Sequence, residues 1–306
     1  MQQFDCVIID YGHGGQDPET GVYVDNHKQY TFQGESVPRF NRGLHIVEGV
    51  INRQIAARLI AKLLELEIRV VDAVAELVYF PGEEPPTWED LEQENETLDN
   101  RVRVANAHPD GLFVSLHSNA IGNETSGPGT ATGGAIVFTS PGQTQSDPVA
   151  ETFIEELERF LTRDSDRTVA RGDMTDGDRD YESDFHVLMH TEGAAVLVEG
   201  LFFTNLGDAL FLRSEGGQDL LARAYASAIA QWVRVQPPHP NVGHPAIAHV
   251  MRCFELVSGD GVSDTFNSLA HKLADALPPG PEVTVALRDL LRAKESALRA
   301  AVIGES

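Results

Sequence analysis

The 306-residue sequence lacks several features that identify common classes of protein. Its two cysteines, Cys6 and Cys253, are too few for a disulfide framework, and the apolar run around Cys6 predicts a buried thiol. No apolar run approaches the ~18 to 20 residues that a membrane-spanning helix requires. Internal repeats and low-complexity tracts are also absent from the sequence. These absences favour a globular protein without disulfides and without membrane insertion.

Positive charge is scarce as well. The chain has 23 basic and 47 acidic residues, which gives a formal net charge of −24. This excess of negative charge disfavours binding to nucleic acids or to anionic membranes. The opening MQQFDCVIID has neither a basic region nor a long apolar core, so we predict no signal peptide and synthesis in the cytoplasm.

Short apolar runs alternate with helical periodicity in the first three quarters of the chain. CVIID at 6–10 predicts a buried strand, and apolar residues at every fourth position from Ile51 to Leu63 predict a helix that ends near Leu66. Further strands are expected in IRVVDAV, GLFVSLHSNA, GGAIVFTS and AAVLVEG, with helices at 98–107, 148–161 and 220–233. This alternation predicts an α/β fold with a mixed, largely parallel twisted sheet flanked by helices.

Proline-rich stretches divide the chain. PPHPNVGHP at 237–245 carries four prolines and predicts a linker between a catalytic domain at 1–236 and an appendage at 246–306. The appendage has the periodicity of a small C-terminal helical hairpin with PPGP at its turn. The acidic stretch at 79–95, with three prolines, is expected to be an exposed loop.

Three polar residues stand where predicted strands end. His13 follows the first strand within GHGG, His117 ends LFVSLH, and Glu199 ends AAVLVE. In an open α/β sheet, ligands collect outside the carboxyl ends of the strands. We therefore expect these three side chains to converge on one site.

Glu48 is a fourth candidate. It precedes Ile51 by three residues, so a helix that begins there places its carboxylate on the apolar face. An unpaired buried carboxylate is costly, and a metal ion offsets that cost. Two imidazoles and one carboxylate form a zinc set that leaves one position open for water, and Glu199 suits the transfer of a proton from that water.

Each of these residues also has a purely structural interpretation. His13 could hydrogen-bond within its loop, Glu48 could interact with the helix dipole, and Glu199 could pair with an arginine. No local motif joins the four residues, so spacing alone leaves the zinc interpretation about as probable as the structural one. His186 and His190 in HVLMH form a competing metal pair if they are helical, but no third ligand is near them in sequence.

Several motifs, taken in order, resemble the zinc-dependent N-acetylmuramoyl-L-alanine amidases of the amidase type 3 family. VIIDYGHGGQDP is similar to the family's first strand and zinc histidine, and EGVINRQIAARL to its ligand-bearing helix. LDNRVRVANAHPDGLFVSLHSNA and AAVLVEGLFFTNLGDALFL resemble the later motifs. The resemblance implies one Zn²⁺ held by His13, Glu48 and His117, with Glu199 as the catalytic glutamate and Asn119 as a supporting residue.

The sequence departs from the family in two places. The interval between His13 and Glu48 is longer than usual, so 22–44 looks like an insertion beside the groove, and Glu35 becomes an alternative carboxylate ligand. We prefer Glu48 because the helix register points it inward. Leu201 stands where the family has glycine, which is expected to alter the backbone beside Glu199.

The resemblance implies hydrolysis of the amide between N-acetylmuramic acid and L-alanine, with peptidoglycan or muropeptides as partners. The hairpin is more weakly similar to a small helical module of phage proteins, which implies a phage endolysin that acts on the cell wall after release, with homo-oligomerisation through the hairpin as one role. Two rivals remain open: a zinc peptidase that cuts within the stem peptide, and a non-catalytic phage particle component that docks on the wall.

Overall fold

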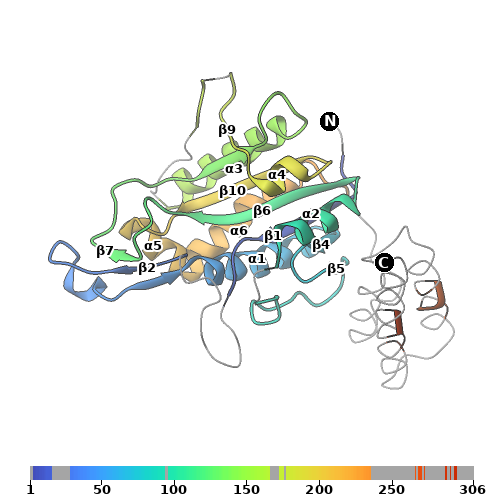
Figure 1. The fold of residues 1–306 in the computed structure, drawn as a ribbon, viewed down its shortest axis with the longest axis horizontal. Helices are drawn as coiled ribbons and strands as arrows, with labels where there is room; N and C mark the ends of the chain where they lie inside the picture. The colour runs from blue at the N-terminus through green and yellow to red at the C-terminus, as the bar shows by residue number, and fades with distance from the viewer. Residues whose placement is uncertain are drawn as a thin grey trace, which may run out of the picture.

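The central feature of the fold is a seven-stranded sheet with helices on both faces (Figure 1). The computed structural model describes residues 3–15, 28–93, 96–165, 172–175 and 177–235, together with scattered helical positions between 266 and 294. The mixed α/β prediction is confirmed. The linker predicted at 237–245 lies outside the described residues, as does most of 246–306, so the division into domains stays a prediction.

Four parallel strands form the middle of the sheet. Its order is β5 (Leu77–Tyr79), β4 (Val70–Asp72), β1 (Cys6–Tyr11), β6 (Gly111–Asn119), β10 (Ala195–Phe202), β8 (Ile136–Thr139) and β9 (Tyr181–Glu182). Strands β4, β1, β6 and β10 are parallel, whereas β5 and β8 run antiparallel to their neighbours β4 and β10. The carboxyl ends of β1, β6 and β10 therefore lie side by side.

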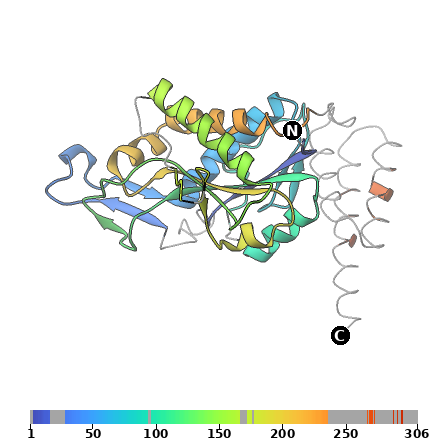
Figure 2. The ribbon, with the colours of Figure 1, turned by 90° about the horizontal axis from the view of Figure 1, so that it is seen from above.

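Two sets of helices cover the two faces of the sheet (Figure 2). One face carries α1 (Glu48–Glu65), α3 (Asp147–Ser165) and α6 (Glu215–Ile229), and the other carries α2 (Leu98–Asn106) and α4 (His186–His190). Successive strand residues alternate between these faces. In β6, Leu116 joins the larger core beneath α1, whereas Phe113 belongs to the smaller core beneath α2 and α4. His117 therefore points to the α2 side.

Helix α1 has the apolar stripe and the first residue that the sequence predicts. Ile51, Ile55, Leu59 and Leu63 are all buried, as the periodicity predicts. Glu48 is the first helical residue and is also buried. The helix thus delivers a carboxylate to the end of the sheet while its apolar stripe packs beneath it.

A second, three-stranded sheet stands beside the carboxyl ends of the parallel strands (Figure 1). It joins β2 (Gln29–Phe32) to β3 (His45–Val47) and to β7 (Ser126–Gly127), with the short 3-10 helix η1 (Arg39–Asn41) between β2 and β3. Strand β7 forms because β2 offers an edge to pair with. The described part of the 22–44 segment therefore forms a wall at the edge that bears the candidate residues.

The helices formed by described residues include none that is both long and apolar enough to cross a bilayer. Cys6 is a buried free thiol, as predicted, and Cys253 lies outside the described residues. Of the described part of the acidic stretch at 79–95, Glu84, Glu89 and Asp90 are exposed, but Leu91 is buried. The expectation of an exposed loop is therefore wrong for its end.

Candidate metal centre

His13 lies in a tight loop directly after β1. Its backbone has a φ of 65°, in the left-handed region, which is uncommon for a residue other than glycine. Arg53 Nη1 donates a hydrogen bond of 2.6 Å to the His13 carbonyl and so holds this conformation. Gly12 must lack a side chain, because a Cβ there would lie 1.9 Å from the His117 ring. The glycine thus lets the two histidine-bearing segments approach each other.

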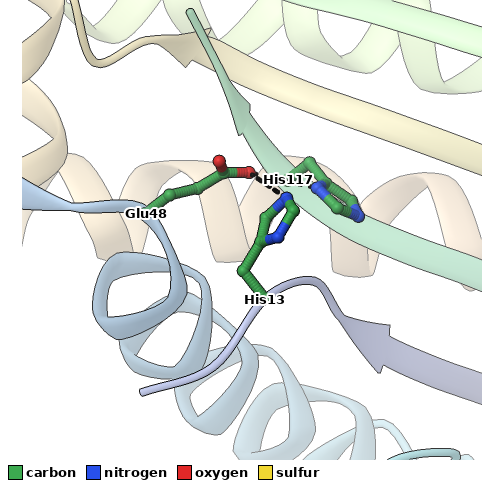
Figure 3. A group of neighbouring side chains, drawn as sticks. All are labelled: His13, Glu48 and His117. Carbon is green, nitrogen blue, oxygen red and sulfur yellow. Dashed lines mark hydrogen bonds and ion pairs between the residues drawn. The ribbon is translucent and has the colours of Figure 1, made fainter. Parts of the chain in front are cut away.

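Glu48 links the two histidines (Figure 3). Its Oε1 lies 3.0 Å from His117 Nδ1 and 3.5 Å from His13 Nε2. The backbone N–H of Ser118 also donates to this oxygen at 3.3 Å. Burial raises the pKa of Glu48, and the charges of His13 and Lys28 oppose that rise. A cation at this point would remove the cost of burying the carboxylate.

His13, Glu48 and His117 form one group of candidate ligands, the metal group, whose donor atoms all lie within 4.8 Å of one another. The two imidazole rings meet edge to face, with centroids 5.0 Å apart. Burial is the largest influence on His117 and lowers its pKa, which favours the neutral imidazole that ligates metals. Two neutral nitrogens and a carboxylate oxygen match the donor set of a catalytic zinc site. Among the described residues this is the only group with such spacing.

Asn52 lies one turn after Glu48 and hydrogen-bonds to two other segments of the site. Its Nδ2 donates to the Gly12 carbonyl at 3.0 Å, and its Oδ1 accepts from Ser118 Oγ at 3.1 Å. These two bonds connect α1 to the His13 loop and to the end of β6. Contacts of this kind fix the orientation of metal ligands. Sequence reasoning missed Asn52. Its signal was a polar amide on an apolar helix face, and the structure shows that this amide is buried.

Arg53 also stabilises the His13 loop, through the hydrogen bond to the His13 carbonyl and through further contacts. It is fully buried, donates to Gly49 O at 2.9 Å and to Glu92 O at 2.6 Å, and stacks over the Tyr11 ring. The end of the 79–95 stretch takes part as well, because Gly15 N donates to Gln93 O at 2.9 Å. The stretch that looked like a solvated loop therefore supports the candidate ligand His13.

Glu199 lies opposite His117 in the pairing of β10 with β6. It points to the same side of the sheet, and its Oε2 is buried without a hydrogen-bond partner among the described residues. Burial raises the pKa of Glu199 to about 7. A carboxyl group with a pKa near neutrality, next to the candidate metal ligands, suits proton transfer.

The backbone after Glu199 is irregular. The pairing shifts between Glu199 and Phe202, and Leu201 adopts a φ of 98° although it is not a glycine. This is the position at which the sequence departs from the family pattern. Leu201 is fully buried, so the packing of its side chain offsets the unfavourable backbone conformation.

A cavity of about 520 Å³ opens beside these residues. His13, His117 and Glu199 line it from the strand ends, and Leu98, Phe185 and His186 line it from the α2 and α4 side. The cavity is large enough for a peptide or saccharide fragment, since small-molecule sites measure roughly 300 to 1,000 Å³.

The remaining candidates are not among the three clustered donors. Glu35 is exposed, and its carbonyl accepts a hydrogen bond from Arg42, so the structure does not bring it to the histidines. Asn119 Oδ1 accepts from Ala120 N at 2.7 Å, which is a turn contact. HVLMH is helical, with its histidine rings 4.4 Å apart, but His186 binds Asp99 at 2.8 Å rather than a third metal donor.

Comparisons with known proteins give a consistent result. One relative is an uncharacterised protein of Bacillus subtilis, YqiI, which is 34% identical over 133 residues. The alignment covers 44% of this chain and spans only 56% of the length of that relative.

Solved structures of amidases share the fold. An N-acetylmuramoyl-L-alanine amidase from Clostridium difficile 630 aligns with a TM-score of 0.51 and 24% identity over 75% of this chain and 96% of that one. The catalytic domain of the amidase CwlV from Bacillus (Paenibacillus) polymyxa var. colistinus gives a TM-score of 0.51 and 20% identity over 74% and 97%. Residues 7–231 match the family described as N-acetylmuramoyl-L-alanine amidase, Amidase_3. The chain therefore belongs to the N-acetylmuramoyl-L-alanine amidase family.

Proposed function

We propose that this protein is a zinc-dependent hydrolase of the amide bond that joins N-acetylmuramic acid to the L-alanine of the stem peptide. Family membership supports the bond that is cut, and the clustering of His13, Glu48 and His117 supports the metal. The single observation that carries the proposal is that these three donors meet next to Glu199, whose buried oxygen has no described hydrogen-bond partner.

Zinc in this site would supply a water acidified to a pKa of roughly 7 and a Lewis acid for the substrate carbonyl. The chain's own residues then have distinct roles. His13, Glu48 and His117 would hold the ion, and the hydrogen bonds of Asn52 and Arg53 to the His13 loop keep their geometry fixed. Glu199 takes a proton at its carboxylate from the attacking water and delivers it to the leaving nitrogen of L-alanine.

The proposal is tested by digesting purified muropeptides with the full chain, with and without a chelator. We expect mass spectrometry to detect free stem peptides with an L-alanine amino terminus, only in the sample without chelator. Intact muropeptides after incubation with protein shown to contain zinc would contradict it.

Two rival functions give different products in the same digestion. A zinc peptidase that cuts within the stem peptide would create a new amino terminus other than that of L-alanine. A non-catalytic wall-docking component of a phage particle would bind peptidoglycan without releasing a product. The buried, unpartnered oxygen of Glu199 favours an enzyme, because a binding protein has no use for a costly unpartnered carboxylate.

The biological setting extends this proposal. Action on the cell wall follows from the proposed substrate, whereas a phage origin, release as an endolysin and oligomerisation through 246–306 remain predictions. Gel filtration of the full chain and of a chain that ends at residue 236 tests the last of these. A larger assembly for the full chain alone is the expected result.

A further inference from the structure

Lys28 lies where two cavities of the molecule meet. It lines the cavity of about 520 Å³ that holds the metal group, and it also lines a second cavity of about 340 Å³ on the side of β2 and β7. Among the residues that the structure describes, it is the one that both linings share. A ligand that extends from one cavity toward the other would therefore lie beside Lys28.

The position of Lys28 is fixed by the site itself. Its carbonyl accepts a hydrogen bond of 2.9 Å from the N–H of Glu48, the first residue of α1, and the next residue begins β2. The side chain is partly buried, and no hydrogen bond or ion pair involves its ammonium group within the described parts of the chain. Lys28 is thus held at its backbone while its charge remains available to a ligand.

The other cationic groups of the larger cavity are already engaged. Arg101 pairs with Asp10 at 2.9 Å, and His186 pairs with Asp99 at 2.8 Å. Lys28 is the remaining permanent cation in the described part of that lining, in a chain with a net charge of −24. An anionic group that enters the cavity away from the metal donors finds a charged hydrogen-bond donor in Lys28, and a hydrogen bond to a charged group is about twice as strong as one between neutral groups.

The field of Lys28 reaches the candidate catalytic groups. Burial is the main cause of the raised pKa of Glu48 and of Glu199, and the positive charge of Lys28 opposes the rise in both. This agrees with an ammonium group close to the metal donors. It also suggests a competing role, in which Lys28 only keeps these carboxylates ionised, and the experiment must separate the two.

We propose that Lys28 is a specificity-determining residue that binds a carboxylate of the stem peptide and so orients the peptide across the metal group between the two cavities. The inference rests on the proposed amidase function. It places an anionic peptide at the junction of the cavities, with the more apolar wall of Leu98, Phe185 and Val187 on one side and the polar wall of Gln29, Asn123 and Glu124 on the other.

The test compares two matched muramoyl peptides whose peptide carboxyl groups are either free or amidated. For Lys28→Gln we expect KM to rise about tenfold on the free-carboxylate substrate, while kcat and zinc content stay within about twofold of wild type. On the amidated substrate the KM of wild type and variant should agree. Lys28→Arg retains the charge and should restore most of the affinity. Lys62→Gln, which removes a lysine paired with Asp219 at 2.7 Å far along α1, is the matched control.

The outcomes separate this inference from the proposed function. A KM that is unchanged in Lys28→Gln, or that rises equally on both substrates, overturns the carboxylate contact. A fall in kcat or in zinc content at constant KM assigns Lys28 to the competing electrostatic role and also overturns it. If the wild type turns over neither substrate, the proposed function fails, and calorimetry of the free stem peptide with the zinc-loaded protein decides the contact: equal affinity in wild type and Lys28→Gln overturns it.

Discussion

Two buried polar clusters lie on the same side of the sheet, and they differ in how completely their carboxylate oxygens are paired. Both oxygens of Asp10 are engaged, by Arg101 Nη1 at 2.9 Å and by Ser115 Oγ at 2.5 Å. In the neighbouring cluster, Glu48 shares one oxygen among His117, His13 and Ser118, and Glu199 Oε2 has no described partner. Ser115 and His117 are only two positions apart in β6.

The difference in charge is as clear as the difference in pairing. Asp10 and Arg101 neutralise each other within the protein. Glu48 and Glu199 face two imidazoles, and burial lowers the pKa of His117, so the two carboxylates, once ionised, give the second cluster an excess of negative charge. A closed, neutral cluster contributes to the fold, whereas an open, negative cluster is suited to a cation and a reacting proton. The contrast shows why burial alone does not identify a functional site.

The largest expected effect comes from Glu199→Gln. The amide keeps the shape of the side chain but cannot accept a proton, so activity on muropeptides should fall by about 10²- to 10⁴-fold, or about 3 to 5.5 kcal/mol in the activation barrier. Zinc content should remain at the wild-type level, because Glu199 is not one of the three clustered donors. Initial rates and metal analysis measure both.

The control for this variant is Glu65→Gln, at the exposed end of α1. It should leave both activity and zinc content unchanged. Wild-type activity in Glu199→Gln would remove the residue from the mechanism. The unpaired oxygen of Glu199 would then be no sign of a catalytic role.

Arg101→Met tests the closed cluster. Removing one partner of a buried pair leaves Asp10 uncompensated, which should lower the free energy of unfolding by about 3 to 5 kcal/mol in urea titrations. The double variant Asp10→Asn with Arg101→Met should recover part of this loss, because no buried charge is left alone. A loss below about 1 kcal/mol for the single variant would show that the pair is not a structural element.

Asn52→Ala has the smallest expected effect. Asn52 is hydrogen-bonded like the closed cluster, but the segments that it orients belong to the open one. Its amide orients the segments that carry the candidate ligands without being a ligand, so zinc affinity should fall by about 10- to 100-fold while the fold is retained. Competition with a zinc chelator measures this change. Gln54→Ala, two positions along α1, is the control, since its side chain contacts Gln218 rather than the site. Equal affinity in the two variants would count against the positioning role.

Local sequence patterns predicted the elements of the fold better than their contacts. The apolar runs located β1, β6 and β10, and the apolar residues at every fourth position located α1. Both patterns are visible in sequence because side-chain alternation and helix pitch are local properties. The placement of His13, His117 and Glu199 at strand ends followed from this, since parallel strands share an edge. Glu48 was predicted from helix register, and the structure places its carboxylate beside both histidines.

The contacts that complete the site join segments far apart in the chain. Asn52 binds Gly12 across 40 positions, and Arg53 binds Glu92 across 39. Nothing in the local pattern of 79–95, with its acidic residues and prolines, reveals that its end packs on the His13 loop. The 22–44 segment was recognised as an extra wall, but the pairing of β2 with β7 that places Lys28 depends on a partner strand almost a hundred residues later.

The sequence by itself determined the α/β architecture and the set of chemical groups at the strand ends, because both depend on periodicity and on the parallel order of strands. The tertiary structure decided which of those groups meet, which are fully paired and which are left open to a ligand. The physical reason is that pairing is a property of distance in space: Asp10 and Glu199 are both carboxylates at strand ends, and only packing gave one an arginine and left the other without a described partner.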